Sequence, residues 1–163
     1  MLFYALPTAG SVEMTPSPAA LTLIKHFEGF RAEPYFCPAG KKSVGFGHVI
    51  GPDDHLPKTL SLDQADHLLR HDLESLSRMI GVAIECPLTQ NQFDALCCLV
   101  YNIGTSAFLK STLARKLNVG DDIESCASEF LRWDKATVNG QKVTLEGLTR
   151  RRAAERALFL GDL

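Results

Sequence analysis

The sequence lacks long apolar runs, basic targeting segments and a large excess of either charge. No stretch of 18 consecutive apolar residues occurs, so the sequence predicts no membrane-spanning helix. The N-terminal run MLFYALPTAG contains no basic residue and its apolar part ends at Pro7, so it predicts no secretory signal peptide. The net charge of −2 gives no argument for binding to nucleic acid or to an anionic surface, so we expect no nucleic-acid partner and, without a long apolar run, no stable membrane insertion.

Metal-binding and phosphate-binding motifs are also missing. There is no HExxH motif, and the glycines of GFG at 45–47 do not have GxGxxG spacing. His67 and His71 have helical i, i+4 spacing, but no third ligand follows at a typical distance, so we predict an exposed helix face and neither metal nor cofactor. The five cysteines fit no metal-site pattern, and we expect them to be mostly reduced, as in a cytosolic protein.

The chain does contain enough apolar sequence for one domain. Its 163 residues are 45% hydrophobic and 22% charged, which is typical of a single globular domain. Residues 1–16 contain two prolines and two threonines, and we expect an irregular lead-in there. The domain itself is expected to span residues 17–163, with no internal repeat.

Helical signals dominate this domain. A helix is predicted to start at Ser17-Pro18, and capping boxes begin two further helices at Ser61 and Thr89. The helix after Thr89 is apolar almost all round as far as Tyr101, which indicates a central, buried helix. The predicted helices end near Glu28, Ile80 and Asn102, and three more cover about 107–118, 121–133 and 147–160.

Residues 31–50 have a different character. Two prolines and three glycines break any helix, and short runs of Tyr, Phe and Val between them predict a small twisted hairpin or sheet. Asn139-Gly140 is a strong turn signal between two later elements. The expected fold class is α+β and mostly α, with one small β patch near the front of the chain.

Glu28 is the leading candidate for chemistry. It ends an apolar helix, and a carboxyl group in an apolar cleft favours its neutral form, which can protonate a leaving oxygen. Cys37 and Ser43 lie on the two arms of the predicted hairpin, where a tight turn would place them side by side to hold a water or attack a carbon. Arg151 and Glu155 have the i, i+4 spacing of a helix ion pair, unless one arginine turns inward toward a buried acid.

The segment EGFRAEPYFCPAGKKSVGFGH, residues 28–48, resembles the catalytic segment of phage-type lysozymes, the endolysins of glycoside hydrolase family 24. That family has Glu, eight residues, Asp or Cys, five residues and Thr, followed by Ile-Gly-Tyr-Gly-His. Here Glu28, Cys37 and Ser43 have the same spacing, and VGFGH follows at 44–48. Later blocks resemble those of the family in the same order over roughly residues 17–160: 92–96, 101–104, 108–113, 130–133 and 147–155.

The resemblance implies hydrolysis of the β-1,4 bond between N-acetylmuramic acid and N-acetylglucosamine in peptidoglycan, which lyses the host cell. It also implies a lysozyme-like fold with a small β-containing lobe at about 29–60 and a helical lobe at about 61–163. The active cleft lies between the lobes. An enzyme of this kind is expected to act as a monomer and to wait in the host cytoplasm until a holin releases it to the cell wall in the periplasm.

The resemblance also assigns residues to roles. Glu28 is the acid, Cys37 stands where many members have Asp, and Ser43 stands where most have Thr. One arginine of the helix that ends the chain is expected to neighbour Glu28. The remaining expected contributors are substrate-binding residues His48, Val49, Tyr101, Asn102 and Ser111, and supporting residues Arg151 and Arg152.

A cysteine in the second catalytic position leaves the mechanism open. A neutral thiol is a poor base, so Cys37 needs a lowered pKa, or acts as a nucleophile, or positions water together with Ser43. Glu33 is a nearby second carboxylate. Two rival functions remain at this point. A lytic transglycosylase cleaves the same bond with one glutamate and leaves a 1,6-anhydro product, and a lysozyme-like protein that only binds saccharide needs no acid at all.

Overall fold

The described chain begins with a helix that leads into a three-stranded sheet. The computed structural model describes residues 13–37 and 40–162, so the predicted lead-in lies outside the described residues as far as residue 12. Helix α1 (Pro18–Glu28) begins where the Ser17 side chain accepts a hydrogen bond from the amide of Ala19. It ends at Gly29, whose φ of 68° suits glycine and turns the chain into the sheet. The antiparallel strands are β1 (Arg31–Phe36), β2 (Lys42–Gly45) and β3 (His48–Val49), in that order.

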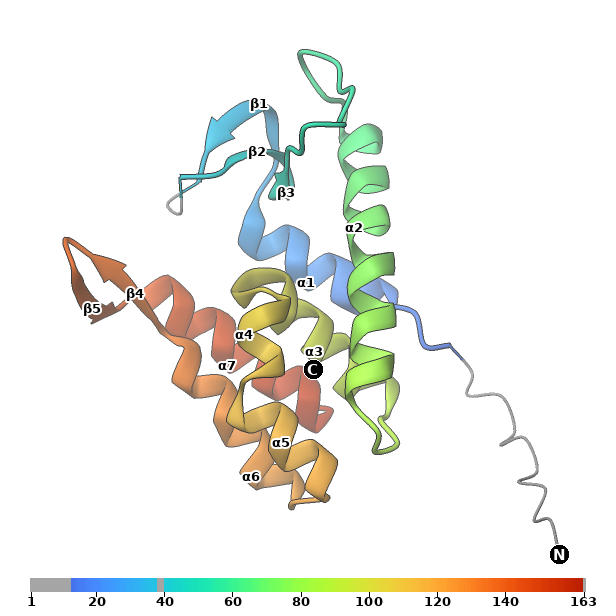
Figure 1. Ribbon diagram of the computed structural model, residues 1–163, viewed down its shortest axis with the longest axis vertical. Coiled ribbons are helices and arrows are strands. Elements are labelled where there is room, and N and C mark those ends of the chain that lie inside the picture. The colour runs from blue at the N-terminus through green and yellow to red at the C-terminus, as the bar shows by residue number, and fades with distance from the viewer. Residues whose placement is uncertain (1–12, 38–39, 163) are drawn as a thin grey trace, which may run out of the picture.

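Two helices form the centre of the helical lobe. Helix α2 (Leu62–Ala83) begins at the predicted capping box of Ser61 and runs from the sheet along one side of the molecule (Figure 1). Helix α3 (Gln90–Ile103) packs against α1, α2 and the last helix, and each of its residues from 93 to 100 is buried. The prediction of a central, buried helix is therefore confirmed.

The later helices are more broken than the sequence predicted. The helix expected at 107–118 is two helices, because the Ser111 side chain accepts a hydrogen bond from the amide of Ala114 and starts a new helix there. The segment expected at 121–133 changes from α to 3₁₀ geometry part of the way along. The elements are α4 (Thr105–Leu109), α5 (Thr112–Val119), α6 (Ile123–Ser128), the 3₁₀ helix η1 (Glu129–Trp133) and α7 (Glu146–Leu160).

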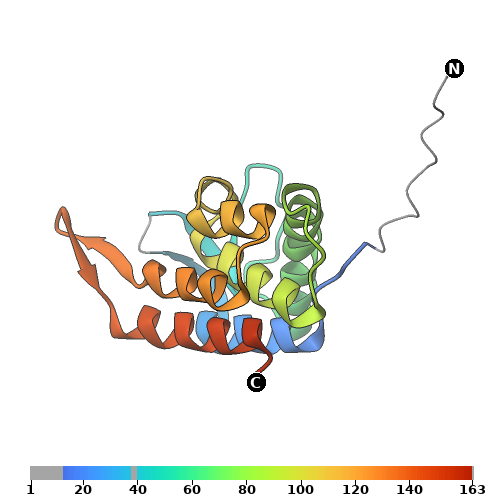
Figure 2. The same ribbon diagram turned by 90° about the horizontal axis from the view of Figure 1, so that it is seen from below.

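A second hairpin contradicts the expectation of a single β patch. Strands β4 (Lys135–Val138) and β5 (Gln141–Thr144) pair antiparallel around Asn139-Gly140, whose φ angles of 49° and 80° match the predicted turn. Both views show this hairpin projecting from the helical lobe (Figures 1 and 2). It was missed because nearly all of its residues are exposed, which removes the alternating apolar pattern of a half-buried strand.

Four cysteines of the described residues are present as thiols. Cys86, Cys97, Cys98 and Cys126 form no disulfide, and the last three are buried. Burial raises the pKa of Cys97 to about 12, so this thiol stays neutral and packs as a small apolar group.

Within residues 13–37 and 40–162, no helix combines the length and the apolar character that a membrane span requires.

Candidate active site

Glu28 and Arg151 form the centre of the site. Arg151 Nη1 donates to Glu28 Oε1 at 2.5 Å, joining the end of α1 to α7 across 123 residues of sequence. The Glu28 side chain is 19% exposed and that of Arg151 is 5% exposed, so one carboxylate oxygen is engaged in the protein while the group still reaches the surface. Arg151 is therefore the inward-turned arginine that the sequence left open as an alternative.

The GFG segment passes directly over Glu28. A Cβ atom on Gly47 would lie 3.1 Å from Glu28 Oε2, and the φ of 91° at this position also favours glycine. The carbonyl of Phe46 accepts a hydrogen bond from the Tyr101 hydroxyl at 2.9 Å, which ties the segment to α3. Burial raises the pKa of Tyr101, so its hydroxyl remains a donor in this contact. The sheet connection is thereby held against the acid.

Cys37 and Ser43 are not directly opposite each other. Ser43 in β2 pairs with Tyr35 in β1, while the amide of Cys37 bonds to the carbonyl of Lys41 at 2.9 Å. Because side chains alternate along a strand, Cys37 and Tyr35 lie on one face and Ser43 is diagonal to Cys37 on that face. The expectation of side-by-side placement was therefore wrong by two residues of register.

Tyr35 is a neighbour of the catalytic candidates that the sequence reading missed. Its pKa is raised, first by burial and then by electrostatic interaction with Glu28 and Cys37. Strand register was needed to find it, because nothing in the local sequence distinguishes it from other strand tyrosines. Ser43 beside it is only 2% exposed.

Two grooves contain predicted site residues. One, of about 640 Å³, is lined by Glu28, Asn102 and Arg151 together with the start of α7. The other, of about 510 Å³, is lined by Gly47, whose Cα faces Glu28 Oε2, and by Val49 and Tyr101. The structure thus brings three of the predicted substrate-binding residues to these two grooves.

Ser111 lies in a third depression. This hollow is lined by Ser111, Trp133 and the base of the β4–β5 hairpin, and Glu28 is not among its lining residues. The Ser111 hydroxyl is already engaged as the cap of α5.

His48 is held between two aspartates. Its Nδ1 lies 2.9 Å from the carboxylate of Asp72 on α2, and its Nε2 lies 3.1 Å from Asp54 Oδ2. Asp54 also accepts the amide hydrogen of Gly51 at 2.6 Å, which closes the loop that follows β3. His48 is 9% exposed with both ring nitrogens engaged, so its contacts are those of a clasp between the sheet and α2. In the sequence, Asp54 belongs to Gly-Pro-Asp-Asp at 51–54, a pattern that indicates a loop but not a hydrogen bond to His48.

The His48 clasp predicts a stability change with pH. The hydrogen bond with Asp72 raises the pKa of His48 above its ordinary 6.5, so its contribution to the free energy of unfolding is fully present below about pH 6.5 and is lost as pH rises through the higher folded pKa. The pKa of Asp54 is lowered, first by the Gly51 amide, so its contribution is lost only in acid. We expect the wild-type protein to lose more unfolding free energy between pH 6 and pH 9 than His48→Gln.

Urea denaturation at the two pH values measures this difference. His67→Gln is the matched control, because His67 lies exposed on α2. An equal pH dependence in the wild type and His48→Gln would show that the clasp does not titrate as described.

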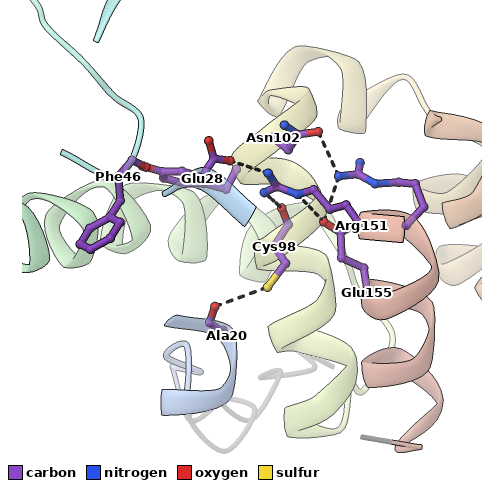
Figure 3. Close-up of polar contacts among 9 residues, drawn as sticks. Ala20, Glu28, Phe46, Cys98, Asn102, Arg151 and Glu155 are labelled. Carbon is purple, nitrogen blue, oxygen red and sulfur yellow. Dashed lines mark hydrogen bonds and ion pairs between the residues drawn. The ribbon is translucent and has the colours of Figure 1, made fainter. Parts of the chain in front are cut away.

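A buried network of charges continues behind Glu28. Glu155 Oε1 accepts from Arg151 Nε at 3.0 Å and from Arg152 Nη2 at 2.9 Å. Arg152 Nη2 also donates to Asn102 Oδ1 at 2.9 Å, so a chain of contacts leads from the acid to an amide in the same groove (Figure 3). Both supporting arginines therefore face inward, and only Arg151 touches Glu28.

Comparison with known proteins identifies the family. The family model described as "Phage lysozyme" matches residues 25–155. An endolysin of Acyrthosiphon pisum secondary endosymbiont phage 1 is 45% identical over 88% of this chain and 96% of its own length. Among solved structures, an endolysin from Escherichia coli O157:H7 phage FAHEc1 is 36% identical, with a TM-score of 0.82 over 92% of this chain and 96% of that chain.

A second solved structure carries the name of an activity. The muramidase domain of SpmX from Asticaccaulis excentricus is 39% identical, with a TM-score of 0.79 over 88% of this chain and 96% of that chain. The sequence resemblance is confirmed by these matches, and they favour neither a transglycosylase nor a protein that only binds saccharide. The chain belongs to the phage lysozyme family.

Proposed function

We propose that this protein is an endolysin that hydrolyses the β-1,4 bond between N-acetylmuramic acid and N-acetylglucosamine in peptidoglycan, with residues 17–163 as its catalytic domain. The observation that carries this proposal is the placement of Glu28. Its Oε1 accepts a hydrogen bond from Arg151, its Oε2 lies against Gly47, and the side chain lines a groove of about 640 Å³. A carboxylic acid fixed in this way can protonate the leaving oxygen of a glycosidic bond.

The attacking water is assigned to Cys37 and Ser43. An inverting hydrolase uses a second group on the opposite face of the sugar to activate water. By the family resemblance Cys37 occupies the second catalytic position, and strand register places Ser43 diagonal to it and opposite Tyr35. In this proposal Cys37 is deprotonated, and its thiolate takes the proton of a water that the Ser43 hydroxyl helps to orient, while the hydroxide that remains bonds to the anomeric carbon as the leaving oxygen takes the proton of Glu28.

The substrate lies along the two grooves that flank Glu28. Asn102 contributes on one side, Val49 and Tyr101 on the other, and Ser111 bounds the more distant depression. His48 supports the groove indirectly, because its clasp fixes the strand that carries Val49.

A lysis assay tests the function itself. Wild-type protein is expected to clear a suspension of Gram-negative cells stripped of their outer membrane, and failure to clear it would refute the proposal.

Substitutions of Cys37 test its role as the base. Cys37→Asp is expected to keep activity within about tenfold of wild type, whereas Cys37→Ala is expected to lose about 10²-fold or more, the usual contribution of general-base catalysis. Initial rates of peptidoglycan solubilisation measure both. Cys86→Ala is the control, because Cys86 is a half-buried thiol that lines none of the grooves described above. A Cys37→Ala variant as fast as wild type would remove the thiol from the mechanism.

The route to the cell wall is proposed by analogy with endolysins. We place the protein in the host cytoplasm, as a monomer, until a holin permeabilises the membrane and admits it to the periplasm. Expression in Escherichia coli with and without a co-expressed holin tests this. Lysis is expected only with the holin, and lysis of equal speed without it would show a different export route.

A further inference from the structure

We infer that Arg152 is a positioning residue that fixes the side-chain amide of Asn102, so that its NH₂ group faces the substrate groove. This inference rests on the proposed function, because it concerns how the same groove binds sugar. Arg152 is completely buried, whereas Asn102 is exposed and lines the groove beside Glu28. The buried guanidinium group of Arg152 therefore contacts the exposed side-chain amide of Asn102.

The chemistry of the contact determines the orientation of the amide. Arg152 Nη2 lies 2.9 Å from Asn102 Oδ1. A guanidinium group only donates hydrogen bonds, so the amide atom that faces it is the carbonyl oxygen. The Asn102 NH₂ group is consequently the part of the amide left for the groove. The groove therefore presents a donor beside the acid, and this donor selects a hydrogen-bond acceptor of the sugar, such as a hydroxyl or an acyl carbonyl oxygen.

Glu155 holds this arrangement from behind. Its Oε1 accepts from both arginines, and it is completely buried. One arginine ends on the acid Glu28 and the other on Asn102, so a single buried carboxylate orients both groups that face the groove (Figure 3). An acid and an amide 74 residues apart in sequence are thereby held in one relative position.

The cost of this network also points to a functional role. Arg152 Nε and Nη1 and Glu155 Oε2 are buried and make no hydrogen bond to the described residues. Buried charged groups with unsatisfied atoms destabilise a fold, and apolar residues of similar size are often equally stable or better. The network lowers the stability of the fold and ends on two groove residues, Glu28 and Asn102. We therefore attribute its presence to the positioning of these two side chains.

Asn102→Asp is the most informative substitution. The carboxylate keeps the contact with Arg152 but replaces the outward NH₂ donor with an acceptor. The KM for a soluble peptidoglycan fragment is expected to rise about tenfold, with kcat changed by less than about threefold. Asn91→Asp is the control, because Asn91 lies exposed on the same helix and lines neither groove. An unchanged KM, or a loss confined to kcat, would overturn the inference.

A double-mutant cycle tests whether Arg152 acts through Asn102. Arg152→Lys and Arg152→Met are expected to raise KM in the wild-type background and to add nothing to the KM of Asn102→Ala. A further rise in that background would show that Arg152 acts by another route.

Nuclear magnetic resonance gives a readout that does not depend on activity. The side-chain amide of Asn102 is expected to give one sharp pair of ¹⁵N–¹H signals in the wild type, and to lose its distinct shift in Arg152→Lys. Identical signals in both proteins would contradict the contact. If the wild-type protein failed to cleave peptidoglycan, the proposed function would fail while this measurement still decided the role of Arg152.

Discussion

Replacing Glu28 with glutamine is expected to slow peptidoglycan hydrolysis by about 10²-fold to 10⁴-fold. Glutamine keeps the shape of the side chain and an oxygen that can accept from Arg151, but it has no proton to give to the leaving oxygen. The loss is therefore expected in kcat, because the interaction that disappears is made in the transition state. Initial rates on purified peptidoglycan measure it.

Glu33→Gln is the matched control for this substitution. Glu33 is exposed on β1 and is the nearby second carboxylate. Its replacement is expected to leave the rate within about twofold of wild type, since the proposed mechanism gives Glu33 no part in the acid–base chemistry. Equal rates for Glu28→Gln and the wild type would remove Glu28 from the chemistry.

Replacing Arg151 with methionine is expected to lower the free energy of unfolding by about 3–5 kcal/mol. Arg151 lies between two carboxylates, Glu28 and Glu155, and its removal leaves the completely buried Glu155 with Arg152 as its remaining cationic partner. The same substitution releases Glu28, so activity is expected to fall as well. Equilibrium denaturation with urea measures the first effect, and Arg151→Lys serves if the methionine variant does not fold.

Arg150 provides a control one residue away. Arg150 forms an ion pair with Glu146 in which the two side chains are 70% and 84% exposed. Exposed pairs of this kind contribute about 0–1 kcal/mol, so Arg150→Met is expected to be nearly neutral. If both variants lost the same free energy of unfolding, the buried position of Arg151 would not explain the destabilisation.

The sequence alone was sufficient to single out Glu28 as the candidate acid and to predict the main elements around it. Glu28 could be found because a helix end, a glycine-rich segment and a fixed spacing coincide there. The buried character of α3 followed from a run that is apolar on every face. These are local signals, and each has a direct physical cause in periodicity, capping or glycine conformation.

The partners of the site residues could not be read from the sequence. The choice between Arg151 and Arg152 depends on which one faces α1, and their neighbouring positions carry the same residue type. The clasp of His48 needed the packing of a loop and α2 on β3. Likewise, Tyr35 stands opposite Ser43 because the ladder is irregular between Arg31 and Tyr35. Such contacts are set by tertiary packing and strand register, neither of which has a signature in one sequence.

The most direct test of the account is the chemical nature of the product. Peptidoglycan digested in water enriched in ¹⁸O and analysed by mass spectrometry reports how the bond was cleaved. With Glu28 as acid and a water held by Cys37 and Ser43, each new reducing end of N-acetylmuramic acid is expected to carry one ¹⁸O atom from the solvent. Fragments that end only in 1,6-anhydro-N-acetylmuramic acid, without solvent oxygen, would contradict a hydrolytic mechanism.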